Sequence, residues 1–310
     1  MKAPVEKGTA VSDSSWLWAA FTLIAAAAQT VRNATQRELT VALGTVGATH
    51  VRFLFGVPFA LLFLLGVMLA LGRGLPRPPP VYWPWIVGGA ASQFAATALM
   101  LMAMGERSFV VTIAYIKTEP VQVALLGLVL LGDTLTAPMA AAIVIATAGV
   151  VLISLRPGTV VSGGRATLLG LGAGTMFGLS AIGYRGAILR LEDPSFVMAA
   201  TFTLAVGLAM QSLLLTLYLW LFDRSVLVAI VRAWRPSLLA GFMGALASQF
   251  WYLAFALATA ASVRTLALVE VLFAQAISRF VFRQPLSGRE ALGIVLIVVG
   301  VALLIWTYRI

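Results

Sequence analysis

Four charged residues lie inside otherwise apolar stretches of the chain: Lys117, Glu119, Arg264 and Glu270. At the middle of a bilayer an ionisable side chain costs at least about 2.5 kcal/mol, so it normally faces a bundle interior or a water-filled cavity. Lys117 and Glu119 are two positions apart, which places them about 200° from each other around a helix axis. They cannot pair with each other, so each needs a partner on another helix. Two interpretations stay open, an interhelical ion pair and a role along a substrate path.

Pro120 directly follows one of these charges. A proline inside a helix removes one backbone hydrogen bond, here the one to the carbonyl of Ile116, and predicts a kink. A carbonyl freed at mid-membrane can bind a substrate ammonium, although the bend can equally be structural alone.

Two polar pairs, Ser92-Gln93 and Ser248-Gln249, lie near aromatic residues such as Trp251. Hydroxyl and amide groups can bind the carboxylate and ammonium of a zwitterion, and aromatic rings supply an apolar wall. The alternative is that the glutamines join helices through hydrogen bonds worth about 1 kcal/mol each. The predicted substrate-binding set is Gln29, Asn33, Ser92, Gln93, Tyr115, Tyr184, Ser248, Gln249 and Trp251; the predicted gating or buried-charge set is Lys117, Glu119, Pro120, Arg264 and Glu270.

Catalytic and metal-binding constellations are missing from the sequence. The chain has no cysteine and one histidine, His50, which rules out thiolate sites and histidine clusters. It also lacks a phosphate-binding loop. We therefore expect no metal, no cofactor and no enzymatic activity. The net charge of +10 is spread along the chain, so nucleic-acid binding is a poor explanation, and anionic lipid headgroups are a simpler one.

The elements that must position these residues are membrane helices. The 310 residues are 61% hydrophobic and 10% charged, whereas soluble domains are about 45 to 50% apolar and 25% charged. A helix needs about 20 apolar residues to cross the hydrocarbon core. The sequence predicts ten such helices, at 16–37, 45–71, 83–104, 109–131, 136–155, 166–190, 196–222, 236–258, 262–283 and 289–307.

The chain also repeats itself. The letters ASQF occur at 91–94 and again at 247–250, each near the start of the third helix of its half. Further along, Glu119 falls on Glu270 and Gly149 on Gly300, and upstream Arg32 falls on Arg185.

The repeat predicts two five-helix halves, 1–155 and 156–310. Because each half crosses the membrane an odd number of times, the second half is inverted relative to the first. The predicted fold is an all-α integral membrane protein with ten transmembrane helices in two inverted repeats around a central cavity. Small residues seven apart recur on one face of the fifth and tenth helices, Ala142 with Gly149 and Gly293 with Gly300, and indicate packing rather than binding. Six glycines in 166–190 suggest either a helix that bends during transport or close packing.

On these residues the chain resembles the ten-helix EamA type of the drug/metabolite transporter superfamily, and most of all the YddG-type aromatic amino-acid exporters. The strongest local mark is TEPVQVALLGLVLLGDTLTA at 118–137, which is similar to the family's proline in helix four followed by a glycine-acid pair. In the second half Val271 replaces the proline, and Arg283 with Gln284 replaces the glycine-acid pair.

This resemblance implies a transporter of the cell inner membrane that exports amino acids, aromatic and other neutral ones, by alternating access. It also implies cytoplasmic termini, although the distribution of Lys and Arg opposes that orientation. We expect a monomer whose partners are the substrate and the lipid bilayer. The alternatives are a drug or nucleotide-sugar carrier and, from another class, a membrane-embedded enzyme acting on a lipid.

Overall fold

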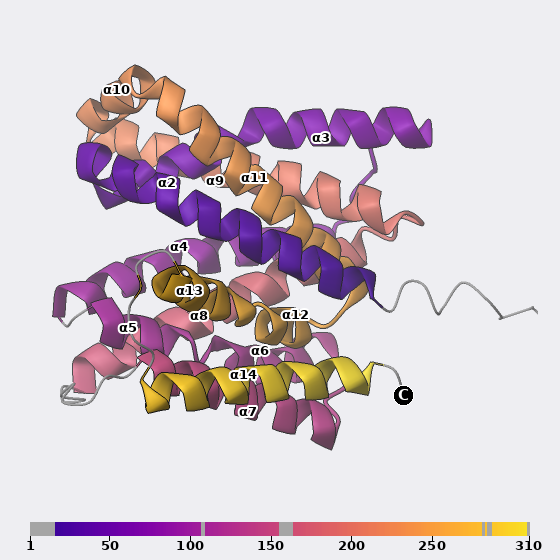
Figure 1. Ribbon diagram of the computed structural model, residues 1–310. Helices are drawn as coiled ribbons and strands as arrows, with labels where there is room; N and C mark the ends of the chain where they lie inside the picture. Colours follow the sequence, from indigo (N-terminus) through magenta and orange to yellow (C-terminus); the bar gives the residue numbers. More distant parts are fainter. Residues whose placement is uncertain (1–15, 107–108, 155–163, 281–282, 284–286, 309–310) are drawn as a thin grey trace, which may run out of the picture.

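The computed structural model describes residues 16–106, 109–154, 164–280, 283 and 287–308. These residues form helices joined by short connections, with no strand among them. Figure 1 shows the arrangement. The helices are α2 (Leu17–Leu54), α3 (Gly56–Leu71), α4 (Tyr82–Glu106), α5 (Phe109–Ile116), α6 (Glu119–Leu131), α7 (Ala137–Ser154), α8 (Gly164–Arg190), α9 (Phe196–Phe222), α10 (Arg224–Arg232), α11 (Trp234–Leu257), α12 (Ala260–Leu266), α13 (Val269–Phe280) and α14 (Gly288–Thr307).

Eight stretches of the described chain are long and apolar enough to cross a membrane, so the predicted count of ten is not confirmed. The predicted helix 16–37 is not among them, because Gln29, Arg32 and Asn33 lower its hydropathy. The predicted helix 262–283 is not among them either; its described part forms α12 and α13, and residues 281–282 lie outside the described residues. The eight stretches are Leu39–Leu71, Tyr82–Ala103, Ala114–Leu131, Ala137–Ser154, Gly164–Arg190, Phe196–Phe222, Trp234–Leu257 and Gly288–Thr307.

Helix α2 is interrupted at Gly44, which has φ 68° and ψ 173°. Glycine adopts this backbone conformation without the clash that a Cβ would cause. After Gly44 the chain turns back, so the second part of α2 and α3 return past the first part (Figure 1). One long helical stretch therefore forms two antiparallel segments.

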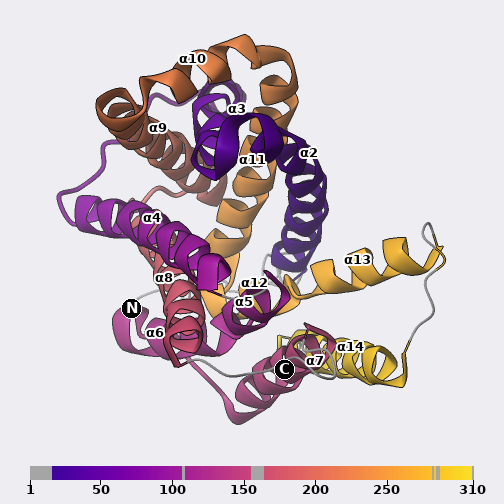
Figure 2. The same ribbon diagram turned by 90° about the vertical axis from the view of Figure 1, so that its left-hand side faces the viewer.

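The main helix contacts join segments that are distant in sequence. Helix α4 packs along α8, α2 along α11, and α7 along α14, and Figure 2 shows the last pair side by side at the edge of the bundle. In the predicted repeat, the third helix of each half thus packs against the first helix of the other half. The two inverted halves stay a prediction, and their boundary at 155/156 lies outside the described residues.

The contact between α7 and α14 depends on small residues. A methyl group built on Gly149 would lie 2.7 Å from the carbonyl oxygen of Gly293, and one on Gly300 would lie 2.6 Å from the amide nitrogen of Ala146. No side chain fits in these places, so the two backbones approach closely. These residues are packing positions, as predicted, and the structure shows that α7 and α14 pack against each other.

The glycines of α8 also serve packing. A methyl group on Gly178 would lie 2.8 Å from Val123 of α6, and one on Gly183 would lie 2.5 Å from Gly89 of α4. Helix α8 runs without interruption from Gly164 to Arg190. The contacts support the packing interpretation of these glycines rather than a bend in this helix.

Candidate functional site

Two helices of the bundle are interrupted at similar places. Helix α5 ends at Ile116 and α6 begins at Glu119; α12 ends at Leu266 and α13 begins at Val269. Pro120 lies in the first turn of α6, where its missing N–H costs no hydrogen bond, and the kink predicted from it is present.

The second interruption occurs without a proline. Val271, which falls on Pro120 in the predicted repeat, donates a short-range backbone hydrogen bond to the carbonyl of Leu268 (3.0 Å). The first interruption has the same kind of bond, from Val121 to Thr118 (3.2 Å). A proline is therefore not required for the break between α12 and α13.

Four buried charges meet at these interruptions. The Lys117 ammonium contacts the Glu270 carboxylate, and Nε of Arg264 lies 3.1 Å from Oε1 of Glu119. The second pair lacks hydrogen-bond geometry, so its attraction is Coulombic. All four side chains are between 14 and 24% exposed. As predicted, Lys117 and Glu119 each find a partner on another helix.

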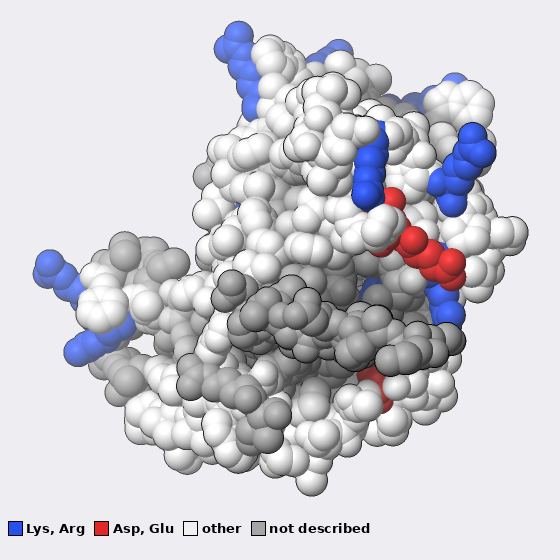
Figure 3. All heavy atoms as spheres, turned by 90° about the vertical axis from the view of Figure 1, so that its right-hand side faces the viewer, with Lys and Arg blue, Asp and Glu red and all other residues white. Residues whose placement is uncertain are grey.

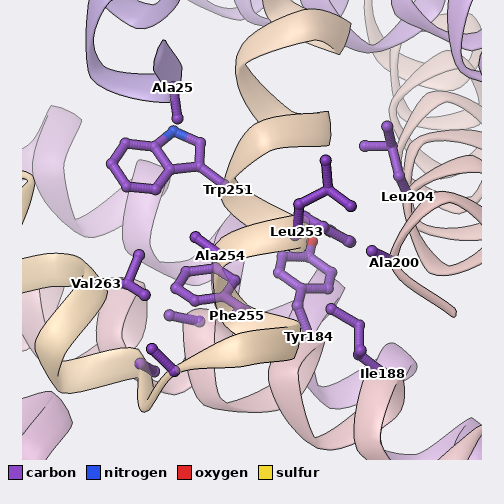
Figure 4. Packing of buried hydrophobic residues seen from close by; sticks show 14 of the residues in the cluster. Ala25, Tyr184, Ile188, Ala200, Leu204, Trp251, Leu253, Ala254, Phe255 and Val263 are labelled. Carbon is purple, nitrogen blue, oxygen red and sulfur yellow. The ribbon is translucent and has the colours of Figure 1, made fainter. Parts of the chain in front are cut away.

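Gln29 and Trp251 complete this group of charges. The Gln29 amide donates to Glu270 (3.0 Å), and the Trp251 indole donates to Gln29 (3.2 Å). The Arg264 guanidinium lies over the Trp251 ring, 5.3 Å from its centre, and 5.6 Å from the centre of the Phe255 ring. Figure 4 shows Trp251 directed toward Ala25 of α2, with Phe255 on the same side of α11. We call Gln29, Lys117, Glu119, Trp251, Arg264 and Glu270 the central polar cluster.

The predicted polar pairs on α4 and α11 take part in contacts between helices. Gln93 accepts a hydrogen bond from Ser180 of α8 (2.9 Å), and Gln249 donates to Thr201 of α9 (2.8 Å). Ser92 is buried and Ser248 is half-buried. These contacts support the interpretation in which glutamines join helices.

Three other predicted residues lie apart from the central polar cluster. The Tyr184 hydroxyl accepts from Gln211 (2.8 Å), and the Tyr115 hydroxyl accepts from Thr167 (3.0 Å). Asn33 is exposed and accepts from its neighbour Arg32 (2.8 Å). The structure thus gathers six of the predicted residues and distributes the others over surrounding contacts.

Two arginines outside the predicted set, Arg32 and Arg52, lie together over Gly244 of α11, the helix that also carries Trp251. Arg32 is 9% exposed. The repeat contains a sequence signal for an arginine without an acidic partner. Arg185, which falls on Arg32, pairs with Asp133 at 2.7 Å. The residue that falls on Asp133 in the second half is Gln284, which has no carboxylate.

The remaining surface offers fewer features. On the face seen in Figure 3, most of the surface is uncharged, and a few acidic and basic side chains lie close together. A surface pocket of about 570 Å³ between α2 and α10 is lined by residues outside the cluster, including Leu43, Ser225 and Arg232. In the described part of the chain, no group of three or more His, Asp or Glu residues could hold a metal ion.

Two comparisons found proteins that are similar to this chain. Residues 164–306 match the model of the EamA-like transporter family. A solved structure titled "Crystal structure of protein" aligns with a TM-score of 0.68 and 18% sequence identity, over 95% of this chain and 98% of that one, which is a likeness of fold alone. No curated protein matches the chain. The family match covers the second part of the chain and is a likeness to membrane transporters, and the long apolar helices support a multi-pass membrane protein.

Proposed function

We propose that the protein is a secondary transporter that exports neutral amino acids, aromatic ones included, across the inner membrane by alternating access. The observation that carries the proposal is the pair of ion pairs in the central polar cluster. Lys117 and Glu119 belong to the first predicted half, and their partners Glu270 and Arg264 belong to the second. These contacts therefore connect the two halves at the point where both contain a broken helix.

The position of the ion pairs suits a movement between the halves. A broken helix already lacks regular backbone bonding at the break, so its two parts can change their angle without disrupting a continuous ladder. Transporters with inverted repeats use such discontinuous helices near the midplane. In this proposal, breaking the two ion pairs lets one half rock against the other.

The chemistry of the cluster suits a zwitterion. It contains two cations and two carboxylates, so a substrate with one ammonium and one carboxylate can replace protein partners without leaving net charge behind. Trp251 and Phe255 beside Arg264 offer an apolar and cation-binding surface for an aromatic side chain. The substrate gradient is the driving force in this scheme.

A second candidate, a carrier of phosphate-bearing metabolites such as nucleotide sugars, is favoured by one observation. Lys117, Arg264, Arg32 and Arg52 all lie inside the bundle, and phosphate groups are bound by several such cations.

The test is counterflow in liposomes that contain the purified protein. Labelled phenylalanine, threonine and methionine should exchange saturably, and liposomes without protein should not show this exchange. Glu270→Gln should reduce the exchange at least about tenfold, because it leaves the Lys117 ammonium without a carboxylate partner.

The matched control is Asp193→Asn, which weakens an ion pair with Arg73 that lies at the surface, where Arg73 is 50% exposed. This variant should transport normally. The double exchange Lys117→Glu with Glu270→Lys should restore part of the flux. Absence of exchange for every amino acid, together with exchange of a nucleotide sugar, would favour the second candidate.

Orientation and assembly belong to the same proposal, which has both termini in the cytoplasm and one chain as the transporting unit. Reporter fusions at the C-terminus test the orientation, and activity of the fusion on the outer side would overturn it. The mass of the protein in detergent micelles tests whether it is a monomer.

A further inference from the structure

Arg32 and Arg52 meet on one surface although twenty positions separate them. On a straight helix they would be about 30 Å apart, but the turn at Gly44 brings the second part of α2 back past the first. A methyl group built on Gly244 of α11 would lie 2.7 Å from Cγ of Arg52 and 3.7 Å from Cδ of Arg32. The aliphatic parts of both side chains therefore pack over the same glycine.

Neither arginine has a carboxylate partner within the described residues. Arg32 donates two hydrogen bonds to the side-chain oxygen of Asn33, at 2.8 and 3.3 Å. The Arg52 guanidinium lies 4.5 Å from the centre of the Phe53 ring. The nearby Arg264 is already paired with Glu119. Two guanidinium groups thus add positive charge beside a cluster that is otherwise balanced.

Such an arrangement is costly unless an anion completes it. A buried cation without a partner loses its hydration and gains no ion pair, and two neighbouring cations repel each other as well. The predicted repeat offers a contrast, because Arg185, which falls on Arg32, donates hydrogen bonds to the Asp133 carboxylate (2.7 Å) and to the carbonyl of Ala258 (2.9 Å). The fold can therefore place an acid beside an arginine at this position of the repeat, but it does not do so beside Arg32.

We infer that Arg32 and Arg52 form a subsite for the carboxylate of an amphiphilic substrate. This inference rests on the proposed transport function and adds to it the groups that recognise the anionic end of the cargo. Guanidinium groups bind carboxylates through paired N–H donors. Aromatic residues lie close by: the Arg52 guanidinium lies 4.5 Å from the centre of the Phe53 ring, and that ring centre is 6.1 Å from the centre of the Phe94 ring. The subsite therefore joins an anion-binding end to an aromatic surface.

Equilibrium binding to the purified protein tests the subsite separately from transport. The probes are 3-phenylpropionate, which has only the carboxylate, phenethylammonium, which has only the ammonium, and inorganic phosphate, all at the same ionic strength. We expect 3-phenylpropionate to bind and to raise the midpoint of thermal unfolding. Arg32→Gln and Arg52→Gln should each weaken that binding about tenfold or more, corresponding to about 1.4 kcal/mol, and Arg52→Lys should weaken it less.

The control variant is Arg73→Gln, whose side chain is half exposed and lies outside the cluster, and it should bind the probe like the unmodified chain. Size-exclusion profiles select variants that fold. Equal binding by the folded Arg32→Gln and Arg52→Gln variants would overturn the subsite, and so would binding of phosphate but not of 3-phenylpropionate. Binding of the probe that depends on the two arginines, without any amino-acid exchange in liposomes, would support the subsite and refute amino acids as the cargo. Amino-acid exchange, together with probe binding that does not depend on the arginines, would support the cargo and refute the subsite.

Discussion

The two equivalent arginines of the predicted repeat should respond in opposite ways to the same substitution. Arg185 and Asp133 form a pair at 2.7 Å with side chains 11 and 14% exposed, and Arg185 also donates to the carbonyl of Ala258. Arg185→Gln leaves the Asp133 carboxylate without its cation and the carbonyl without its donor. Removing one member of a buried pair costs about 3 to 5 kcal/mol.

Arg32→Gln removes a buried charge that has no carboxylate partner in the described chain. Without a bound anion, the folded state loses the hydrogen bonds to Asn33 but also loses the repulsion between Arg32 and Arg52, whose side chains both lie over Gly244. We therefore expect the free energy of unfolding to change by less than about 1 kcal/mol or to rise. The two variants should differ by about 3 kcal/mol, a factor of more than about 100 in the unfolding equilibrium.

The assay is equilibrium unfolding in mixed micelles of a mild detergent and dodecyl sulfate, with a chloride buffer and no carboxylate. Asp133→Asn combined with Arg185→Gln should be more stable than Arg185→Gln alone, because no unpaired ion then remains. Equal losses of stability in Arg185→Gln and Arg32→Gln would refute the reasoning, since Arg32 would then be as fully paired as Arg185.

Two further predictions concern the helices themselves. Gly300→Val should prevent α7 and α14 from packing, because its Cβ would lie 2.6 Å from the amide nitrogen of Ala146. In micelle unfolding we expect the free energy of unfolding to fall by several kcal/mol, or no folded protein to form. The control Gly66→Ala, with open space around it, should change the free energy of unfolding by about 1 kcal/mol or less. Pro120→Ala should leave the break between α5 and α6 in place, because Val271 occupies the corresponding position at a break without proline. Spin labels on cysteines introduced into this cysteine-free chain would measure the angle between α5 and α6. A continuous helix in the variant would contradict the prediction.

The sequence alone determined the fold class and showed which buried charges need partners elsewhere in the chain. Hydropathy depends on local composition, so an all-helical membrane protein could be predicted before any contact was known. The same holds for the need of Lys117 and Glu119 for partners on other helices, and for the small-residue faces of α7 and α14. The count of helices was less secure, because Gln29, Arg32 and Asn33 reduce the hydropathy of the first predicted helix below that of a clear membrane span.

Only the tertiary structure decided which residues meet. The partner of Lys117 is Glu270, 153 positions away. Arg32 and Arg52 lie close together because of a turn at Gly44, and no local sequence pattern distinguished Gly44 from other glycines. The break between α12 and α13 and the use of Gln93 and Gln249 between helices are likewise set by neighbouring helices. The physical reason is that burial in lipid follows from local composition, whereas ion pairs and hydrogen bonds depend on which helix surfaces the folded chain brings together.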